Sequence, residues 1–180
     1  IHFDNYLAGV EIESLLDVMT FFDVDGNLDT QATLDHWHWL VDQGVHGLVV
    51  AGTSGEFIAM TIEERMTLCR LAVDNFSGKI PIVAGTGHNA TKLTVDISRE
   101  AQEIGVDALI VILPYYSRPP LSSVIEHYRT LRRKTDRPIM LYNNPFTSHI
   151  DMSAKFVSRL TAAYEQVRYI KEASMDAARV

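Results

Sequence analysis

The chain has 180 residues, of which 47% are hydrophobic and 22% charged, and its formal net charge is −7. This composition is typical of one globular domain with enough apolar side chains for a core. The acidic balance argues against nucleic acid as a partner, because phosphate binding needs a basic face. A lone cysteine, Cys69, excludes an internal disulfide, and no apolar run is long enough to span a membrane. We expect a cytoplasmic protein, since the acidic start also lacks the basic region of a signal peptide.

The first half of the chain alternates apolar runs with helical patterns. Near-continuous runs of Val, Ile and Leu are typical of parallel strands that are buried on both faces. Such runs cover residues 15–22, 47–51 and 80–84. Between the first two, Leu34, Trp37 and Val41 recur at helical spacing. Between the second and third, Thr61 and Glu64 have the spacing of a capping box, which predicts that a helix begins at Thr61.

The second half continues the alternation. Apolar runs predict three more strands, at residues 108–113, 138–142 and 167–171. Asn89 is an expected N-cap of the helix before them, and Pro119 with Pro120 is expected to open the next helix. Asp151 or Ser153 is expected to start the last helix, which carries Phe156, Val157 and Leu160.

Five strand–helix units and a sixth strand predict a parallel sheet with right-handed crossovers. The sheet is either doubly wound or part of a (β/α)8 barrel. The stretch "GTGH" at residues 85–88 follows a predicted strand, as a phosphate-binding loop would, but it lacks the third glycine of G-x-G-x-x-G. We interpret it as a tight turn, which makes a doubly wound nucleotide-binding protein the weakest of the alternatives.

Lys171 is the one lysine of five that falls within a predicted strand, at the carboxyl end of the run 167–171. Active sites of parallel α/β folds form at that end of the strands. Partial burial there favours the free amine, which a carbonyl compound needs to form a Schiff base. The alternative, a lysine that pairs with a carboxylate or extends to the surface, stays open on these grounds.

Three other predicted strand ends carry polar groups that suit a ligand. Thr53 and Ser54, between Gly52 and Gly55, combine two hydroxyls with exposed backbone N–H groups that suit a small carboxylate. Tyr115 and Tyr116 follow the predicted strand at 108–113 and are candidates for proton relay or for the edge of the core, and Tyr142 ends the predicted strand at 138–142, where its hydroxyl could face Lys171. The histidines show no spacing of metal ligands and Cys69 lies on an apolar helical stripe, so we expect no metal. We expect no other cofactor, because a covalent imine with the substrate on Lys171 would take that role.

The motifs "GTSGEF", "PYYSRPP", "LYNNP" and "YIKEAS", in this order and at these separations, resemble the dihydrodipicolinate synthase / N-acetylneuraminate lyase family of pyruvate-dependent class I aldolases. The resemblance implies a (β/α)8 barrel that assembles as a homo-oligomer, a dimer or a tetramer, and acts on a small 2-oxo acid. It implies that Lys171 forms the imine and Tyr142 relays protons. Thr53, Ser54 and Gly55 would then bind the carboxylate, and Tyr116 would reach across a subunit interface.

Two departures from the family pattern bear on the reaction. Synthases carry an arginine that binds the carboxylate of the second substrate, followed shortly by glycine, whereas this chain has Thr147 and His149 at those positions. Loss of the guanidinium removes a bidentate carboxylate clamp. We therefore expect a Schiff-base lyase or aldolase for pyruvate or a related 2-oxo acid. The alternatives are dihydrodipicolinate synthase itself and a dehydratase or deaminase for 2-keto-3-deoxy sugar acids.

The second departure is length. A (β/α)8 barrel takes about 250 residues, so residues 1–180 are expected to form a single but incomplete barrel domain, covering about strands one to six. A fragment, a truncated sequence, or a second chain that supplies the remainder would each account for this. An alternative of another class follows, a non-catalytic barrel fragment.

Overall fold

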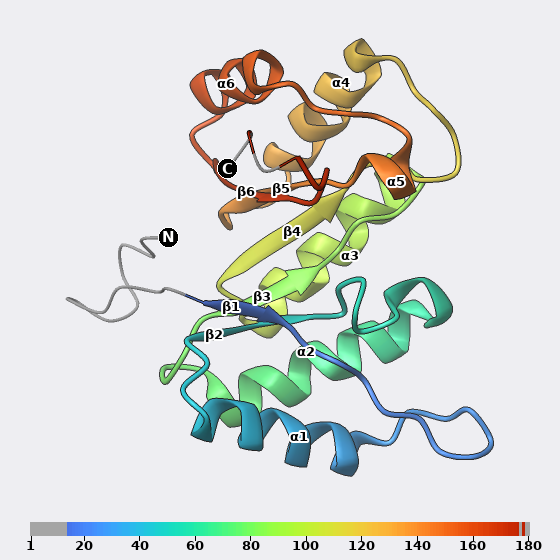
Figure 1. The fold of residues 1–180 in the computed structure, drawn as a ribbon, viewed down its shortest axis with the longest axis vertical. Helices are drawn as coiled ribbons and strands as arrows, with labels where there is room; N and C mark the ends of the chain where they lie inside the picture. Colours follow the sequence, from blue (N-terminus) through green and yellow to red (C-terminus); the bar gives the residue numbers. More distant parts are fainter. Residues whose placement is uncertain (1–13, 177, 179–180) are drawn as a thin grey trace. The chain divides into compact units, whose positions relative to one another are not determined.

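The computed structural model describes residues 14–176 and 178 (Figure 1). Residues 1–13, on which part of the prediction of a cytoplasmic location rests, lie outside the described residues. No helix among those that are described has both the length and the apolar character needed to cross a membrane. The chain forms two compact units. The first comprises the described residues up to Gly85 together with Glu103–Asp107, and the second comprises Thr86–Gln102 together with the described residues from Ala108 onward.

The first unit contains three parallel strands, β1 (Leu15–Asp17), β2 (Gly47–Val50) and β3 (Ile82–Gly85). β2 lies between the other two, and every residue of β2 and β3 is buried. The continuous apolar character of these two strands follows from this position, because both of their faces pack against other side chains. The predicted strands at 47–51 and 80–84 are confirmed within two residues.

Two α-helices and a short 3-10 helix complete the first unit. They are α1 (Thr30–Asp42), η1 (Phe57–Ala59) and α2 (Ile62–Phe76). The capping box predicted at Thr61 is confirmed, since the Thr61 hydroxyl accepts from Glu64 N and the Glu64 carboxylate accepts from Thr61 N. α2 buries Cys69 completely, as its position on the apolar stripe predicts.

The first predicted strand, 15–22, is too long. β1 ends at Asp17, and Phe22 forms an isolated antiparallel bridge with Leu28. The Asp23 carboxylate accepts the backbone N–H groups of Asp25 and Asn27, so it closes a tight turn that reverses the chain. An apolar run alone does not reveal this reversal, because the turn is set by a polar side chain beyond the run.

The second unit also contains three parallel strands, β4 (Ala108–Ile112), β5 (Ile139–Asn143) and β6 (Val167–Glu172), with β5 in the middle. Its helices are α3 (Thr91–Ile104, up to Gln102), α4 (Leu121–Arg132), α5 (Pro145–Ser148) and α6 (Ala154–Ala163). Pro120 directly precedes α4, and Ser153 caps α6 by accepting from Phe156 N, as predicted. The alternation of parallel strands and helices in each unit confirms the α/β class.

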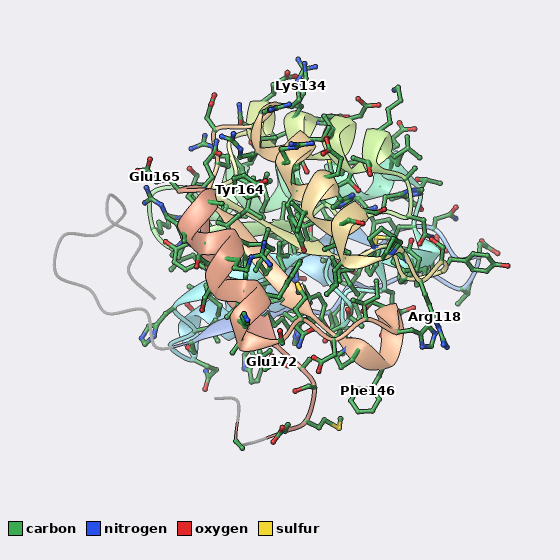
Figure 2. All side chains as sticks on the ribbon, turned by 90° about the horizontal axis from the view of Figure 1, so that it is seen from above. Arg118, Lys134, Phe146, Tyr164, Glu165 and Glu172 are labelled. Carbon is green, nitrogen blue, oxygen red and sulfur yellow. The ribbon has the colours of Figure 1, made fainter. Side chains whose placement is uncertain are left out.

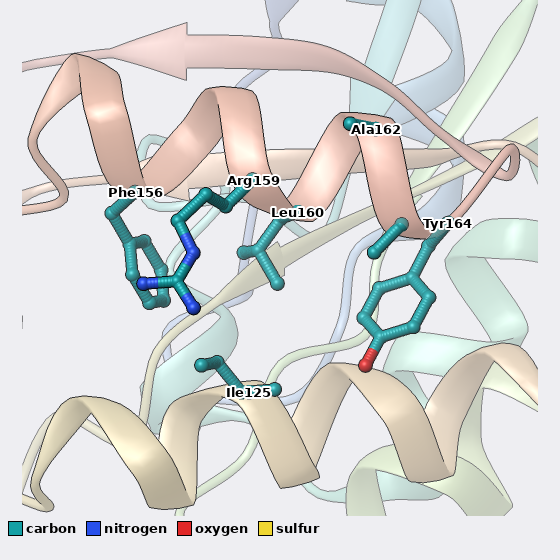
Figure 3. Close-up of a pocket in the computed structure, with 7 residues that line it drawn as sticks. Ile125, Phe156, Arg159, Leu160, Ala162 and Tyr164 are labelled. Atoms are coloured by element: carbon teal, nitrogen blue, oxygen red, sulfur yellow. The ribbon is translucent and has the colours of Figure 1, made fainter.

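α4 and α6 lie side by side and leave a groove of about 370 Å3 between them (Figure 3). Ile125 of α4 faces Phe156 and Leu160 of α6 across this groove. At the end of α6, the guanidinium of Arg132 lies 4.9 Å from the ring centroid of Tyr164. These contacts hold the two helices in place beside the strands that they connect.

Candidate active site

Lys171 and Tyr142 lie side by side on two adjacent strands. They are register partners in the parallel pair β5–β6, so their side chains leave the sheet on the same face. The Lys171 Nζ lies 4.5 Å from the centroid of the Tyr142 ring. Tyr142 is 7% exposed and Lys171 is partly buried, so the amine and the phenol meet in a largely desolvated environment. The aromatic face stabilises a positive charge on the lysine nitrogen.

Asn143 holds the carboxyl ends of β5 and β6 together on the opposite face. It is fully buried, and its Nδ2 lies 3.0 Å from Asp151 Oδ1 and from both carboxylate oxygens of Glu172. Its Oδ1 accepts from Met152 N, and its backbone oxygen accepts from Ala173 N. Because Asn143 and Glu172 are register partners one residue beyond Tyr142 and Lys171, these bonds fix the alignment of the catalytic candidates. Sequence reasoning missed this network, although an asparagine at the end of a buried apolar run is a signal for it.

The turn after β5 contains Asn144, Thr147 and His149. Asn144 is the N-cap of α5, and its Oδ1 accepts from Thr147 N at 3.3 Å. Its Nδ2 donates to the Tyr142 hydroxyl oxygen at 3.2 Å. His149 ends α5 in the left-handed conformation with φ of 57°, the region that favours glycine. Phe146 is 64% exposed and projects outward from α5 (Figure 2).

Tyr116 lies in the segment between β4 and α4. Its side chain is 90% exposed, whereas its backbone N–H and that of Tyr115 are both bound by Asn89 Oδ1 at 2.9 Å. The predicted cap at Asn89 is therefore wrong. α3 begins two residues later, at Thr91, and the Asn89 side chain orders the tyrosine segment instead.

Thr53, Ser54 and Gly55 form a turn in the first unit. Both hydroxyl-bearing residues are exposed, Gly55 is buried, and Glu56 N donates to Thr53 O at 3.1 Å. A β-carbon on Gly55 would lie 3.0 Å from Val18 O, so only glycine fits without displacing the backbone. The predicted turn is present, and its binding of a carboxylate stays a prediction.

A buried arginine, Arg65, contacts the end of β3 and the 3-10 helix that follows this turn. Arg65 of α2 is 2% exposed, and its Nη2 donates to Gly85 O at the end of β3 at 2.6 Å. Its guanidinium carbon lies 5.2 Å from the centroid of the Phe57 ring, in the 3-10 helix that follows the turn. The sequence analysis did not identify Arg65, because an arginine on a helix is usually solvated and only the packing reveals this one as internal.

Of the predicted site residues, Lys171 and Tyr142 are brought together within the second unit, and Tyr116 lies in the same unit with an exposed side chain. Thr53, Ser54 and Gly55 lie in the first unit. The predicted common rim of all these groups stays a prediction. Within the described residues, no group of three or more His, Cys, Asp or Glu side chains is placed to hold a metal ion.

The chain is similar to known proteins over nearly its whole length. The sequence model of the dihydrodipicolinate synthetase family matches residues 12–180. The 4-hydroxy-tetrahydrodipicolinate synthase of Oceanobacillus iheyensis is 39% identical over 161 residues, which cover 89% of this chain and 54% of that protein. That of Bacillus subtilis is 36% identical over 159 residues, which cover 88% and 55%. The chain thus spans about half the length of the curated relatives that it matches.

Solved structures give the same result. A dihydrodipicolinate synthase from Aquifex aeolicus superposes with a TM-score of 0.88 at 32% identity, covering 92% of this chain and 56% of that one. YagE, an E. coli prophage protein of the same family whose structure was solved with pyruvate, superposes with a TM-score of 0.89 at 31% identity. That match covers 92% of this chain and 55% of YagE.

Proposed function

Because the chain belongs to the dihydrodipicolinate synthetase family, we propose that it is a Schiff-base-forming lyase or aldolase for pyruvate or a related 2-oxo acid. The observation that carries this proposal is the position of the Lys171 amine, 4.5 Å from the centroid of the Tyr142 ring on the neighbouring strand. An amine of this kind can attack a carbonyl carbon, and a phenol beside it can move the protons that the reaction requires.

The proposed chemistry proceeds in two stages. The free amine of Lys171 attacks the C2 carbonyl of the 2-oxo acid to give a carbinolamine. The Tyr142 phenol then protonates the carbinolamine hydroxyl, which leaves as water, so that an iminium ion and a Tyr142 phenolate result. The iminium nitrogen then accepts the electron pair of a bond at C3, either C–H or C–C, and becomes a neutral enamine. When the C–H bond breaks, the Tyr142 phenolate takes the proton from C3, and as a phenol it can return it. When the C–C bond breaks, the phenolate takes the proton of the C4 hydroxyl, and C4 leaves as the carbonyl carbon of an aldehyde. The covalent imine is the only electron sink that this scheme needs, so we propose no further cofactor.

We propose that Thr53, Ser54 and Gly55 bind the carboxylate of the same substrate. Two exposed hydroxyls on a turn that glycine keeps tight support this role, since such turns present O–H and N–H donors to an anion. Fixing the carboxylate would orient the carbonyl for attack, which is catalysis by positioning.

Family membership further supports a single (β/α)8 barrel domain, of which residues 1–180 form an incomplete part, and a cytoplasmic homo-oligomer, either a dimer or a tetramer. We propose that Tyr116 acts across a subunit interface in that assembly. Its 90% exposed side chain on an ordered backbone supports this, because a large aromatic group held in solvent is typical of an interface residue.

The candidate reactions differ in what reacts besides the 2-oxo acid bound to Lys171, and two observations favour different candidates. Relatives named 4-hydroxy-tetrahydrodipicolinate synthase favour the synthase reaction itself. Thr147, at the position where the synthases carry arginine, instead favours a lyase, dehydratase or deaminase for 2-keto-3-deoxy sugar acids, since a hydroxyl cannot clamp a carboxylate as a guanidinium does. A non-catalytic fragment is the remaining alternative.

Reductive trapping tests the proposal directly. The protein, expressed within the complete product of its gene, is incubated with pyruvate and reduced with borohydride, and the adduct is mapped by mass spectrometry. We expect the adduct on the peptide that carries Lys171 and its loss in Lys171→Arg, while Lys155→Arg, which changes an exposed lysine of α6, keeps it. Absence of the adduct under conditions that label a known class I aldolase would contradict the proposal.

A further assay separates the candidate reactions. With a 2-keto-3-deoxy sugar acid, an aldolase releases pyruvate and an aldehyde, whereas a dehydratase releases water and retains all carbon atoms in one product. Trapping without turnover of any 2-oxo acid would favour the non-catalytic alternative.

A further inference from the structure

Asn144 connects the Tyr142 hydroxyl to the turn that follows β5. Its side chain makes two hydrogen bonds in different directions. Oδ1 accepts from Thr147 N at 3.3 Å as the N-cap of α5, and Nδ2 donates to Tyr142 Oη at 3.2 Å. The side chain therefore bridges a catalytic candidate and a backbone donor.

The capping bond determines which end of the amide faces the tyrosine. A flipped side chain would set the NH2 group against Thr147 N, a donor against a donor, so the orientation with Nδ2 toward Tyr142 is the one that satisfies both bonds. The turn itself is anchored, because Ser148 is fully buried and its Oγ lies 2.9 Å from Asn144 O and 3.0 Å from Ile150 O. Asn144 is thus a fixed donor.

We propose that Asn144 is a positioning residue that stabilises the phenolate form of Tyr142 and directs its proton transfer. This inference rests on the proposed Schiff-base function. A hydrogen bond donated to the phenol oxygen favours the negative charge on that oxygen. Tyr142 is only 7% exposed, so the amide supplies a donor where solvent has little access. Since Nδ2 donates and cannot accept, a neutral Tyr142 must direct its own proton away from Asn144.

The step that Asn144 assists is the formation of the enamine on Lys171. The C3–H bond of the iminium breaks, its proton passes to the Tyr142 phenolate, and its electron pair forms the C2–C3 double bond while the iminium nitrogen becomes neutral. The Asn144 amide neither gains nor loses a proton. Its N–H group stabilises the phenolate before this transfer and orients the phenol after it.

The test is the exchange of the pyruvate methyl hydrogens for deuterium in D2O, followed by NMR across a range of pH. Asn144→Asp keeps an acceptor for Thr147 N, and aspartate is as good an N-cap as asparagine, but it removes the donor to Tyr142. Asn144→Ala removes both bonds. We expect both variants to exchange about tenfold more slowly, and their rate profiles to move to higher pH.

Two comparisons make the result decisive. If Asn144 only caps α5, Asn144→Asp will exchange at the rate and with the pH profile of the unaltered protein, which overturns the inference. Ser148→Ala weakens the same turn without touching the amide, so it is expected to lower stability and leave the pH profile in place. If the pH profile of the exchange rate shifts as far in Ser148→Ala as in Asn144→Asp, the effect comes from the turn, and the role of the amide is overturned.

Borohydride trapping in the same variants separates this inference from the proposed function. Lys171 is intact in each variant, so each is expected to form the pyruvate adduct. If every protein forms the pyruvate adduct but Asn144→Asp exchanges deuterium at the unaltered rate, the positioning role of Asn144 is overturned and the proposed function stands. No adduct in the unaltered protein overturns the proposed function and the inference with it.

Discussion

His127 of α4 is a buried histidine that makes the stability of the protein depend on pH. It is 3% exposed, and its Nδ1 lies 2.9 Å from Thr91 Oγ1 of α3. Its Nε2 is buried and has no hydrogen-bond partner among the described residues. Burial disfavours the imidazolium and lowers the pKa of His127 from 6.5 to about 4.

The size of the effect follows from these two pKa values. Between pH 6.5 and about 4, the unfolded chain binds a proton at His127 that the folded chain excludes. The free energy of unfolding therefore rises with pH in this window. The difference between the folded and unfolded pKa of His127 corresponds to about 3 kcal/mol of unfolding free energy, at about 1.4 kcal/mol for each pKa unit. The contribution is fully present above pH 6.5 and is lost as the pH falls toward 4.

His127→Gln removes the titrating group while retaining an amide that can bond to Thr91. Urea unfolding followed by circular dichroism, at half-unit steps of pH, gives the free energy of unfolding for each protein. The free energy of unfolding of the unaltered protein, minus that of the variant, should fall by about 3 kcal/mol between pH 7 and pH 4. His38→Gln, in which His127 remains, should keep the pH dependence of the unaltered protein. Parallel curves for His127→Gln and the unaltered protein would show that His127 does not cause the pH dependence.

Three other substitutions have defined outcomes. Tyr142→Phe should slow deuterium exchange into pyruvate by about a hundredfold or more, with an unfolding free energy within about 1 kcal/mol of the original; unchanged exchange would remove Tyr142 from the mechanism. Thr61→Ala should cost about 1 kcal/mol in urea unfolding, because it breaks the capping box with Glu64, and no loss would show that the box is dispensable. Gly85→Ala should cost about 2 kcal/mol or more in the same assay, because its β-carbon would collide with Ala51 O; a neutral effect would contradict the close approach of β2 and β3.

Most of the strands could be predicted from the sequence because burial on both faces leaves a direct pattern. The runs at 108–113 and 167–171 became β4 and β6 within one residue at each end. The prediction of one strand over 15–22 failed because the strand ends at Asp17 and the rest of the run is not uniformly buried, with Met19 49% exposed. Val18 is buried beyond the end of β1, and the chain then turns back at Asp23. Hydrophobicity reports burial, and it does not distinguish a strand from a buried segment that follows one.

The Lys171–Tyr142 pair was predictable for a related reason. In a parallel sheet, residues at the carboxyl ends of adjacent strands lie close together, so two correct strand assignments are enough to bring the pair together. Asn143 and Asn144 were not predictable in this way. The bonds of Asn143 also require a return of the chain at Asp151 after α5, which is not encoded locally.

The turn of α5 combines two features that belong together. Thr147 stands where the family resemblance places a guanidinium, and its backbone N–H is bound by the Asn144 side chain, whose other end bonds to Tyr142. A guanidinium at this position would carry a full positive charge that binds a carboxylate. Thr147 offers only a hydroxyl there, and the neutral amide of Asn144, three residues earlier, donates to the tyrosine. The amide can act on the enamine step of any 2-oxo acid, because it contacts Tyr142 and not the second reactant. In the proposed reaction, the exposed Phe146 and His149 of the same turn are candidates for contacts with that reactant.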